Sequence, residues 1–180
     1  MNRLEFLKKK IDGYLLKEQL FRNQEYAKLQ KPFLGKSRKN LAVANLLFGI
    51  SEKDELKKPL ALSRYFEAHD WVIVVSYYAM YVSALAALAR LGFRSKSHAA
   101  TIAVIEYHYV RNGRALEAKH IEKLSKAHAI SEELMTKLIK SKTSREAAQY
   151  DATPSISREN ARTALEDAEE FISKVEEILA

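Results

Sequence analysis

Apolar residues recur every three or four positions along most of the chain, a spacing that predicts helices. In residues 3–29 the apolar positions at this spacing are Leu4, Leu7, Ile11, Leu15, Leu16, Leu20 and Tyr26. A break is predicted at residues 31–35, which contain Pro32 and Gly35, and a second helix at residues 38–48. No stretch alternates apolar and polar residues strongly enough to indicate a strand, so the pattern predicts an all-α fold.

The longest apolar segment runs from Trp71 to Ala89, inside a helix predicted for residues 62–91 and ended by Gly92. A membrane span needs roughly 20 predominantly apolar residues, so the segment fits either a span or the core helix of a bundle. It contains five Ala, three Tyr and two Ser, which contribute little to insertion into lipid. This content favours a buried helix and no contact with a membrane.

Further helices are predicted downstream, at residues 97–110, 115–128, 131–142, 144–151 and 157–179. Ser97 and Ser157 are suitable N-cap residues for two of them. The last helix has a continuous apolar stripe at Ala161, Ala164, Leu165, Ala168, Phe171, Ile172, Val175 and Ile178. Such a stripe predicts that one face packs against the rest of the domain.

A row of small side chains lies on the long apolar helix, at Ala79, Val82, Ala86 and Ala89. Small residues let a second helix approach closely, and a closed dimer uses the same patch on both subunits. The row therefore predicts a homodimer that forms by helix–helix packing.

Composition narrows the class of protein. A chain of 180 residues fits one domain, or one domain with an appendage. The absence of Cys excludes disulfides, thiolate metal sites and a Cys nucleophile, and suits a cytoplasmic protein. The N-terminus is too charged for a signal peptide. None of the five histidines has zinc-binding spacing, so we expect no metal and no cofactor.

Charge is spread unevenly along the chain. Residues 1–64 carry 15 Lys and Arg against 7 Asp and Glu, whereas residues 153–180 carry 3 against 7. The basic third could contact phosphates, or it could be a solvated Lys-rich face. A candidate site for nucleic acid or another anion combines two cations, a hydroxyl and an imidazole at a predicted helix start, and consists of Arg94, Lys96, Ser97 and His98. The alternative is an ordinary helix cap with exposed basic residues.

One pattern spans four predicted helices and comprises Tyr77-Tyr78-Ala79, Gly92 to His98, Tyr109-Val110 with Gly113, Arg145 to Asp151, and Ala164 to Leu179. It resembles the HEPN-domain family, in particular its small stand-alone prokaryotic and archaeal branch. The resemblance covers roughly residues 38–180. It implies a HEPN-like bundle of four to five core helices, with residues 1–37 as an N-terminal helical extension.

The resemblance also implies a set of activities and partners. HEPN proteins often dimerise, and many are metal-independent ribonucleases that act as toxins paired with a small nucleotidyltransferase antitoxin. Others lack activity and serve as binding modules. Active members use an Arg-x(4–6)-His motif, in which Arg holds the scissile phosphate and His acts as general acid or base.

The position that matches this motif is Arg145, and Gln149, Tyr150 or Asp151 stands where the histidine would be. A tyrosine hydroxyl, with an ordinary pKa of about 10, is a poor base at neutral pH. The resemblance makes Arg145, Tyr150 and Asp151 the candidate catalytic residues. The alternative is a structural cluster that fastens helices together.

Two other pairs, Arg64 with His69 and Arg114 with His120, also fit the motif's spacing. With 5 His and many Arg in the chain, matches of this kind are expected by chance, and their context differs from the family's motif helix.

Three hypotheses follow. The favoured one is a dimeric HEPN-like module that binds nucleic acid, a nucleotide or a partner nucleotidyltransferase, as in a toxin–antitoxin pair, without strong catalysis. The second is an active ribonuclease toxin that uses Arg145 with Tyr150, Asp151 or a histidine from elsewhere in the chain. The third is a helical structural or assembly protein that binds no nucleotide.

Overall fold

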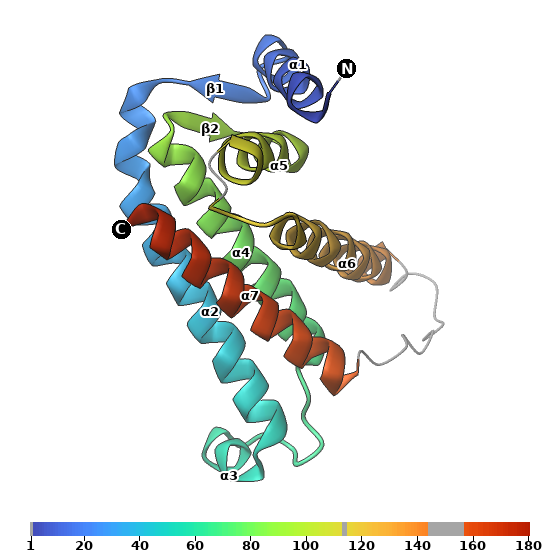
Figure 1. The fold of residues 1–180 in the computed structure, drawn as a ribbon. Helices are drawn as coiled ribbons and strands as arrows, with labels where there is room; N and C mark the ends of the chain where they lie inside the picture. The colour runs from blue at the N-terminus through green and yellow to red at the C-terminus, as the bar shows by residue number, and fades with distance from the viewer. Residues whose placement is uncertain (1, 113–114, 144–156) are drawn as a thin grey trace.

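A computed structural model describes residues 2–112, 115–143 and 157–180 (Figure 1). Its elements are, in chain order, α1 (Arg3–Leu16), β1 (Leu20–Arg22), η1 (Gln24–Leu29), α2 (Gln30–Glu52), α3 (Asp54–Lys57), η2 (Lys58–Leu60), α4 (His69–Arg90), β2 (Phe93–Ser95), α5 (His98–Ile105), η3 (Glu106–Asn112), α6 (Ala118–Thr143) and α7 (Arg158–Leu179). The turns η1 and η2 are 3₁₀-helical, and η3 is π-helical. The predicted all-α bundle is confirmed, with one small sheet added.

Helix α4 is the centre of the bundle. It packs against α2, α6 and α7, and α2 and α7 run beside it along most of its length (Figure 1). By length and composition α4 could cross a membrane, but 78% of its apolar window is buried inside the fold. The prediction of a buried core helix is therefore confirmed for most of α4. Withdrawing its apolar area from water stabilises such a helix.

The small residues on α4 serve packing within the chain. Ala79, Ala86 and Ala89 are fully buried, and Val82 is 6% exposed. Ser37 on α2 donates a hydrogen bond from its Oγ to the carbonyl of Ala79 at 2.8 Å, so the close approach that these residues allow is used by α2. The prediction that this face forms the dimer contact was wrong, because a face occupied by the chain's own helix cannot meet a second copy.

The N-terminal segment folds differently from the single helix predicted for residues 3–29. Helix α1 ends at Leu16, Glu18 takes a positive φ of 53°, and the chain then forms β1. The predicted break at residues 31–35 is also wrong, because α2 begins at Gln30 and runs through it. Pro32 lies in the first turn of α2, where the missing N–H costs no intrahelical hydrogen bond.

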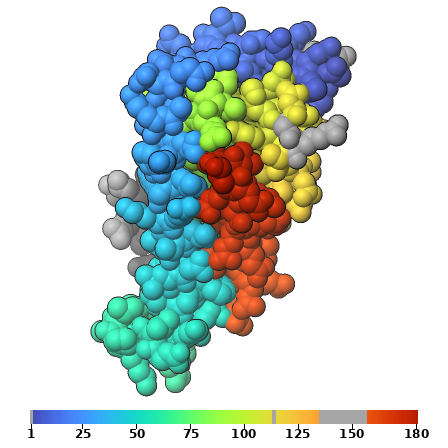
Figure 2. All heavy atoms as spheres, turned by 60° about the vertical axis from the view of Figure 1, so that its left-hand side comes forward, coloured from blue at the N-terminus to red at the C-terminus, as the bar shows by residue number. Residues whose placement is uncertain are grey.

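The two short strands join the N-terminal segment to the bundle. β1 pairs antiparallel with β2 in the register Leu20 with Ser95, Phe21 with Arg94 and Arg22 with Phe93. Figure 2 shows the N-terminal elements gathered at one end of the molecule and the α3 region at the other end. The sequence missed the strands because three residues are too few for an alternating pattern to stand out.

In the second half of the chain, the caps at Ser97 and Ser157 are confirmed. Helix α6 is continuous where two helices were predicted, and the stretch after α5 changes to a π-helix at Glu106. The apolar stripe of α7 is largely buried, as predicted. The helix predicted for residues 144–151 lies outside the described residues.

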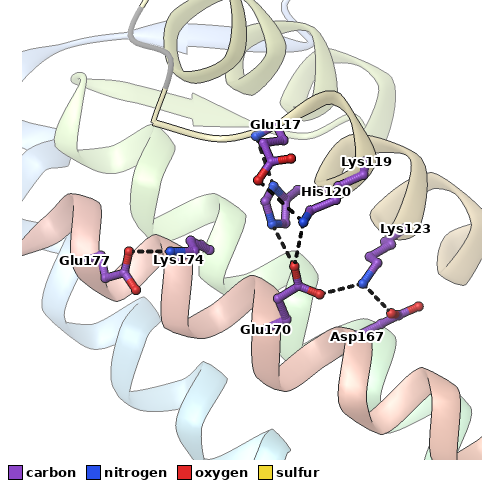
Figure 3. A network of polar contacts seen from close by, with 8 residues as sticks. All are labelled: Glu117, Lys119, His120, Lys123, Asp167, Glu170, Lys174 and Glu177. Carbon is purple, nitrogen blue, oxygen red and sulfur yellow. Dashed lines mark hydrogen bonds and ion pairs between the residues drawn. The ribbon is translucent and has the colours of Figure 1, made fainter.

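Polar contacts fasten α6 to α7 (Figure 3). The Glu170 carboxylate accepts a hydrogen bond from Lys123 Nζ at 2.6 Å and lies 3.3 Å from Lys119 Nζ. The hydrogen bonds from Lys123 and Lys119 lower the pKa of Glu170 to about 2. Buried His120 accepts the backbone N–H of Glu117 at Nδ1, so its Nε2 carries the proton and donates to Glu170 at 3.2 Å.

Candidate functional site

The four residues of the predicted anion site have different contacts in the structure. Arg94 and Lys96 are exposed at the β1–β2 pair. Ser97 caps α5, where its Oγ accepts a hydrogen bond from the N–H of Ala100 at 3.4 Å. His98, the first residue of α5, makes its contacts with α4 and α6 instead.

The outer surface of the β1–β2 pair combines an aromatic ring with two cations. Phe21 pairs with Arg94 in the strand register. Just beyond the end of β2, the backbone N–H of Lys96 donates to the carbonyl of Gln19. Side chains alternate between the faces of a strand, so Phe21, Arg94 and Lys96 share one face, whereas Leu20 points to the core. We call Phe21, Arg94 and Lys96 the ribbon face.

In the described part of the chain Arg94 and Lys96 form no ion pair with a carboxylate, and Lys96 Nζ lies 4.7 Å from the centroid of the Phe21 ring. The exposed lysines of α1, namely Lys8, Lys9 and Lys10, lie on the same end of the molecule. Unpaired cations that are gathered at one end give this surface a positive potential.

An ion pair connects the start of α1 to the bundle. Arg3 donates from Nε and Nη2 to the two carboxylate oxygens of Glu106 at 2.8 and 2.6 Å, and Arg111 Nε lies 3.4 Å from the same carboxylate. Glu106 is only 6% exposed. The hydrogen bond from Arg3 lowers the pKa of Glu106 in spite of its burial, so the carboxylate stays charged and holds α1 in place.

A cluster of aromatic side chains joins α4, α5 and α6. The rings of His98 and His128 stack with centroids 3.7 Å apart, and a 3.1 Å hydrogen bond joins Tyr77 Oη to His98 Nδ1. Tyr81 stacks on His98 at 5.0 Å. Nε2 of His98 and Nδ1 of His128 are buried and have no hydrogen-bond partner among the described residues.

The environment of this cluster favours neutral side chains. Burial, helped by the neighbouring His128, lowers the pKa of His98 to about 4. Burial also raises the pKa of the Tyr77 hydroxyl above its ordinary value. At neutral pH His98 is therefore an uncharged and weak base, and its buried Nε2 is poorly placed to exchange protons with a substrate in water.

The other histidines also have structural partners. His69 Nε2 lies 3.3 Å from Glu52, while Arg64 stacks on Tyr65, so the sequence pair Arg64 and His69 have different partners. The second pair cannot be compared, because Arg114 lies outside the described residues. His120 is fixed by Glu170, and His108 packs beside Phe93. Burial and the nearby Arg22 lower the pKa of His108.

Three predicted site residues lie in the part of the chain that the structure leaves undescribed. Arg145, Tyr150 and Asp151 fall within residues 144–156. Among the described residues no group of three or more His, Asp and Glu could hold a metal ion.

A shallow groove of about 370 Å³ runs between α2 and α7. Arg38 closes one part of it by an ion pair with Glu176 at 2.5 Å, and Asn45 donates to Glu169 at 3.1 Å. Because both α7 residues contribute carboxylates, the groove is a poor site for a phosphate.

Large apolar side chains are exposed on the neighbouring helices α2 and α4. On α4, Trp71 and Tyr78 are 46% and 42% exposed and lie two helical turns apart. On α2, Val43 and Leu46 are exposed as well. Ser37 on α2 donates a hydrogen bond to Ala79, and Ser51 accepts one from the backbone N–H of Ala68. The two helices therefore run antiparallel, and Val43 and Leu46 lie at the level of the stretch from Trp71 to Tyr78. We call Val43, Leu46, Trp71 and Tyr78 the α2–α4 face.

In the part of the chain that the structure describes, the fold is a helical bundle with an exposed apolar face and a basic end, and its histidines are buried or half-buried. A family model described as "HEPN domain" matches residues 60–178, about two thirds of the chain. The protein belongs to the HEPN-domain family, as its sequence pattern suggested. A search of curated proteins finds no significant match. Family membership indicates a function related to nucleotides or RNA, or one of nuclease type.

Sequence reasoning missed three residues that the structure brings to these sites. Phe21 was hidden inside a predicted helix, and its pairing with Arg94 depends on contacts between distant segments. Tyr77 and His128 lie 51 positions apart, and only the packing of α6 on α4 brings their rings to 5.3 Å. The position of Tyr77 in an apolar helix predicts that its side chain is buried, but it does not predict which side chain it contacts.

Proposed function

We propose that this protein is a dimeric HEPN module that binds RNA by electrostatic attraction and has no strong catalytic activity. The observation that carries the proposal is the pair of exposed cations Arg94 and Lys96, which have no acidic partner in the described part of the chain and lie at the basic end of the molecule. Lys and Arg side chains of this kind neutralise phosphates and release counterions, which supplies most sequence-independent binding of nucleic acid.

The state of the histidines supports binding over cleavage. A general acid or base works best when its pKa lies near the working pH and its proton-carrying atom reaches the substrate. His98 meets neither condition, and His69 and His120 are buried against carboxylates. Ribonuclease activity would then depend on Arg145, Tyr150 and Asp151, and it is the alternative to the present proposal.

The α2–α4 face is the proposed homodimer contact. HEPN domains commonly dimerise, and exposed Trp and Tyr side chains are enriched at protein interfaces. A two-fold dimer would bury Trp71 and Tyr78 of both copies at its centre. If the chain instead proves monomeric, the same face is the first place to look for a nucleotidyltransferase partner of the toxin–antitoxin kind. A cytoplasmic location is part of the same proposal.

Salt dependence tests the RNA-binding proposal. The full chain is titrated into a fluorescently labelled RNA, and anisotropy is measured at increasing salt concentration. Binding through phosphates predicts a steep loss of affinity, about 0.7 in the logarithm of the binding constant per logarithm of salt for each phosphate contact with a single strand. No binding at low salt, or binding that salt does not change, would reject the proposal.

A further inference from the structure

The ribbon face is built from two distant parts of the chain. β2 lies inside the region that the HEPN family model matches, residues 60–178, whereas β1 lies about forty residues before that region begins. The aromatic ring comes from β1 and the two cations come from β2 and the residue that follows it. The ribbon face therefore exists only because the N-terminal segment of this chain packs on the HEPN domain.

Backbone contacts hold this surface in a fixed shape. The strands are in register, and hydrogen bonds continue the pairing at both ends: Lys96 N–H donates to Gln19 O at 2.9 Å, and Asn23 N–H donates to Gly92 O at 2.8 Å. Beneath the ribbon, Leu20 and Phe93 are buried in the main core. Phe21 is thus a half-buried ring on a rigid base, which loses little conformational freedom when a ligand covers it.

The side chains suit an extended strand of nucleic acid. Arg94 and Lys96 are two residues apart on one strand face, about 7 Å along the strand, so they can meet different phosphates of one chain. Phe21 lies across the ribbon from Arg94 and offers a flat apolar surface. Proteins that bind single strands without sequence preference use this combination of cations that follow the backbone and aromatic rings on which bases stack.

We infer that the ribbon face binds single-stranded RNA, with one unpaired base stacked on Phe21 and the backbone held by Arg94 and Lys96. This inference rests on the proposed RNA binding. The bases of a duplex are stacked on one another and unavailable to an aromatic ring, so a duplex would meet only the charges.

In the free protein the ammonium of Lys96 lies over the Phe21 ring. A cation–π contact at an exposed site is weak, and the Lys side chain is flexible. An incoming base can therefore displace Lys96 from the ring, and the freed ammonium gains a phosphate. Lys96 therefore covers the Phe21 ring in the free protein and binds the RNA backbone in the complex.

The test compares binding of a short mixed-sequence RNA as a single strand and as a perfect duplex, measured by fluorescence anisotropy with the full chain. Phe21→Leu keeps an apolar side chain on the ribbon but removes the aromatic face. Lys96→Gln removes one cation from the ribbon face, and Lys53→Gln removes one exposed cation at the opposite end of the molecule as its matched control. Thermal unfolding of each variant confirms that the fold is kept.

We expect Phe21→Leu to weaken single-strand binding about ten-fold and to leave duplex binding nearly unchanged, since stacking of one base is lost. Lys96→Gln should weaken both forms and reduce the salt slope for the single strand by about 0.7, whereas Lys53→Gln should change neither. If the wild type binds RNA but Phe21→Leu binds the single strand equally well, the stacking role is wrong and the proposed function stands.

Two further outcomes would also overturn the inference. If polyglutamate of matched charge displaces the RNA and Phe21→Leu makes no difference, the ribbon face is a general anion site that an acidic protein could occupy. If the wild type binds neither form of RNA at low salt, the proposed function fails as well, and the variants are not needed to show it.

Discussion

His98 and His128 stack face to face between α5 and α6, with ring centroids 3.7 Å apart and ring planes 17° from parallel. Tyr77 holds His98 from the α4 side by a hydrogen bond at 3.1 Å. Two parallel imidazoles with buried nitrogens tolerate a proton poorly, because a charge there loses its hydration and meets a second polar ring. The contact of α5 and α6 with α4 is therefore strongest when His98 is neutral.

This arrangement predicts that stability falls with acid in a defined window. The pKa of His98 is lowered from 6.5 to about 4, so between these pH values the unfolded chain binds a proton that the folded chain does not. The free energy of unfolding should rise by up to about 3 kcal/mol from pH 4 to pH 6.5 and then level off. Urea unfolding followed by circular dichroism at several pH values measures it.

The variant His98→Phe isolates the contribution of His98 to this pH dependence of stability. The variant keeps an aromatic ring against His128 but cannot titrate, so its slope in the same window should be clearly smaller than that of the wild type. A residual slope is expected because the lowered pKa of His108 acts in the same direction. A variant that keeps the full wild-type slope would show that His98 is protonated as easily in the folded chain as in the unfolded one.

Glu170 predicts a second loss of stability at lower pH. Its pKa falls from 4.5 to about 2 because of hydrogen bonds from Lys123 and Lys119, so its contribution is present above pH 4.5 and is lost as the pH falls towards 2. Glu170→Gln should cost about 1 kcal/mol at neutral pH, since the pair is partly solvated, and should flatten this acid limb.

The matched control is Glu177→Gln, which removes an exposed carboxylate that pairs with Lys174 on the same helix. Its effect should stay within about 0.5 kcal/mol at all pH values. Equal effects of the two variants would mean that the contacts between α6 and α7 contribute no more than a surface pair.

Gly92 is predicted to be intolerant of substitution. Its φ is +75°, and an added Cβ would lie 3.3 Å from the carbonyl oxygen of Asn23. The backbone N–H of Asn23 donates to the carbonyl of Gly92, which keeps the two residues close together. Gly92→Ala should lower stability by about 1–2 kcal/mol through backbone strain. Gly13→Ala, at a helical position with no atom within 4 Å, should instead raise stability by about 0.5–1 kcal/mol. Thermal unfolding of both variants tests the contrast, and a neutral Gly92→Ala would contradict it.

The α2–α4 face predicts the oligomeric state. Light scattering at micromolar concentration should give about twice the chain mass of 20.6 kDa. Tyr78→Glu should yield a folded monomer, because it places a charge in the centre of the proposed contact. Ala42→Glu, which changes an exposed residue on the α7 side of α2, should leave the dimer intact. A wild-type mass near 20.6 kDa would reject the homodimer.

Local signals in the sequence predicted local structure well. Ser97 and Ser157 were identified as caps because the side-chain oxygen of a residue just before a helix accepts a hydrogen bond from a backbone N–H in the first turn. The burial of α4 followed from its apolar composition. The small residues of α4 were recognised correctly as a site of close helix approach, but the sequence could not tell that the approaching helix is α2 of the same chain, as the hydrogen bond from Ser37 reveals.

Sites that join distant segments could not be predicted in the same way. The pairing of Phe21 with Arg94 bridges more than seventy positions and involves strands of three residues. Pro32 and Gly35 indicated a break, yet Pro is compatible with the first turn of a helix and α2 has strong packing partners that offset the cost of Gly35. His98 was grouped with the cations of the predicted anion site, whereas contacts with Tyr77 and His128, both distant in the sequence, turn its ring inward.

We propose that this HEPN protein binds RNA without cutting it. The most direct measurement incubates labelled single-stranded RNA with the full chain in EDTA at low salt and runs the same sample on a native and a denaturing gel. We predict a shifted band on the native gel and intact RNA on the denaturing gel. If the wild type cuts the RNA in EDTA and a folded Arg145→Ala variant leaves it whole, the protein is a metal-independent ribonuclease and the proposed function is wrong.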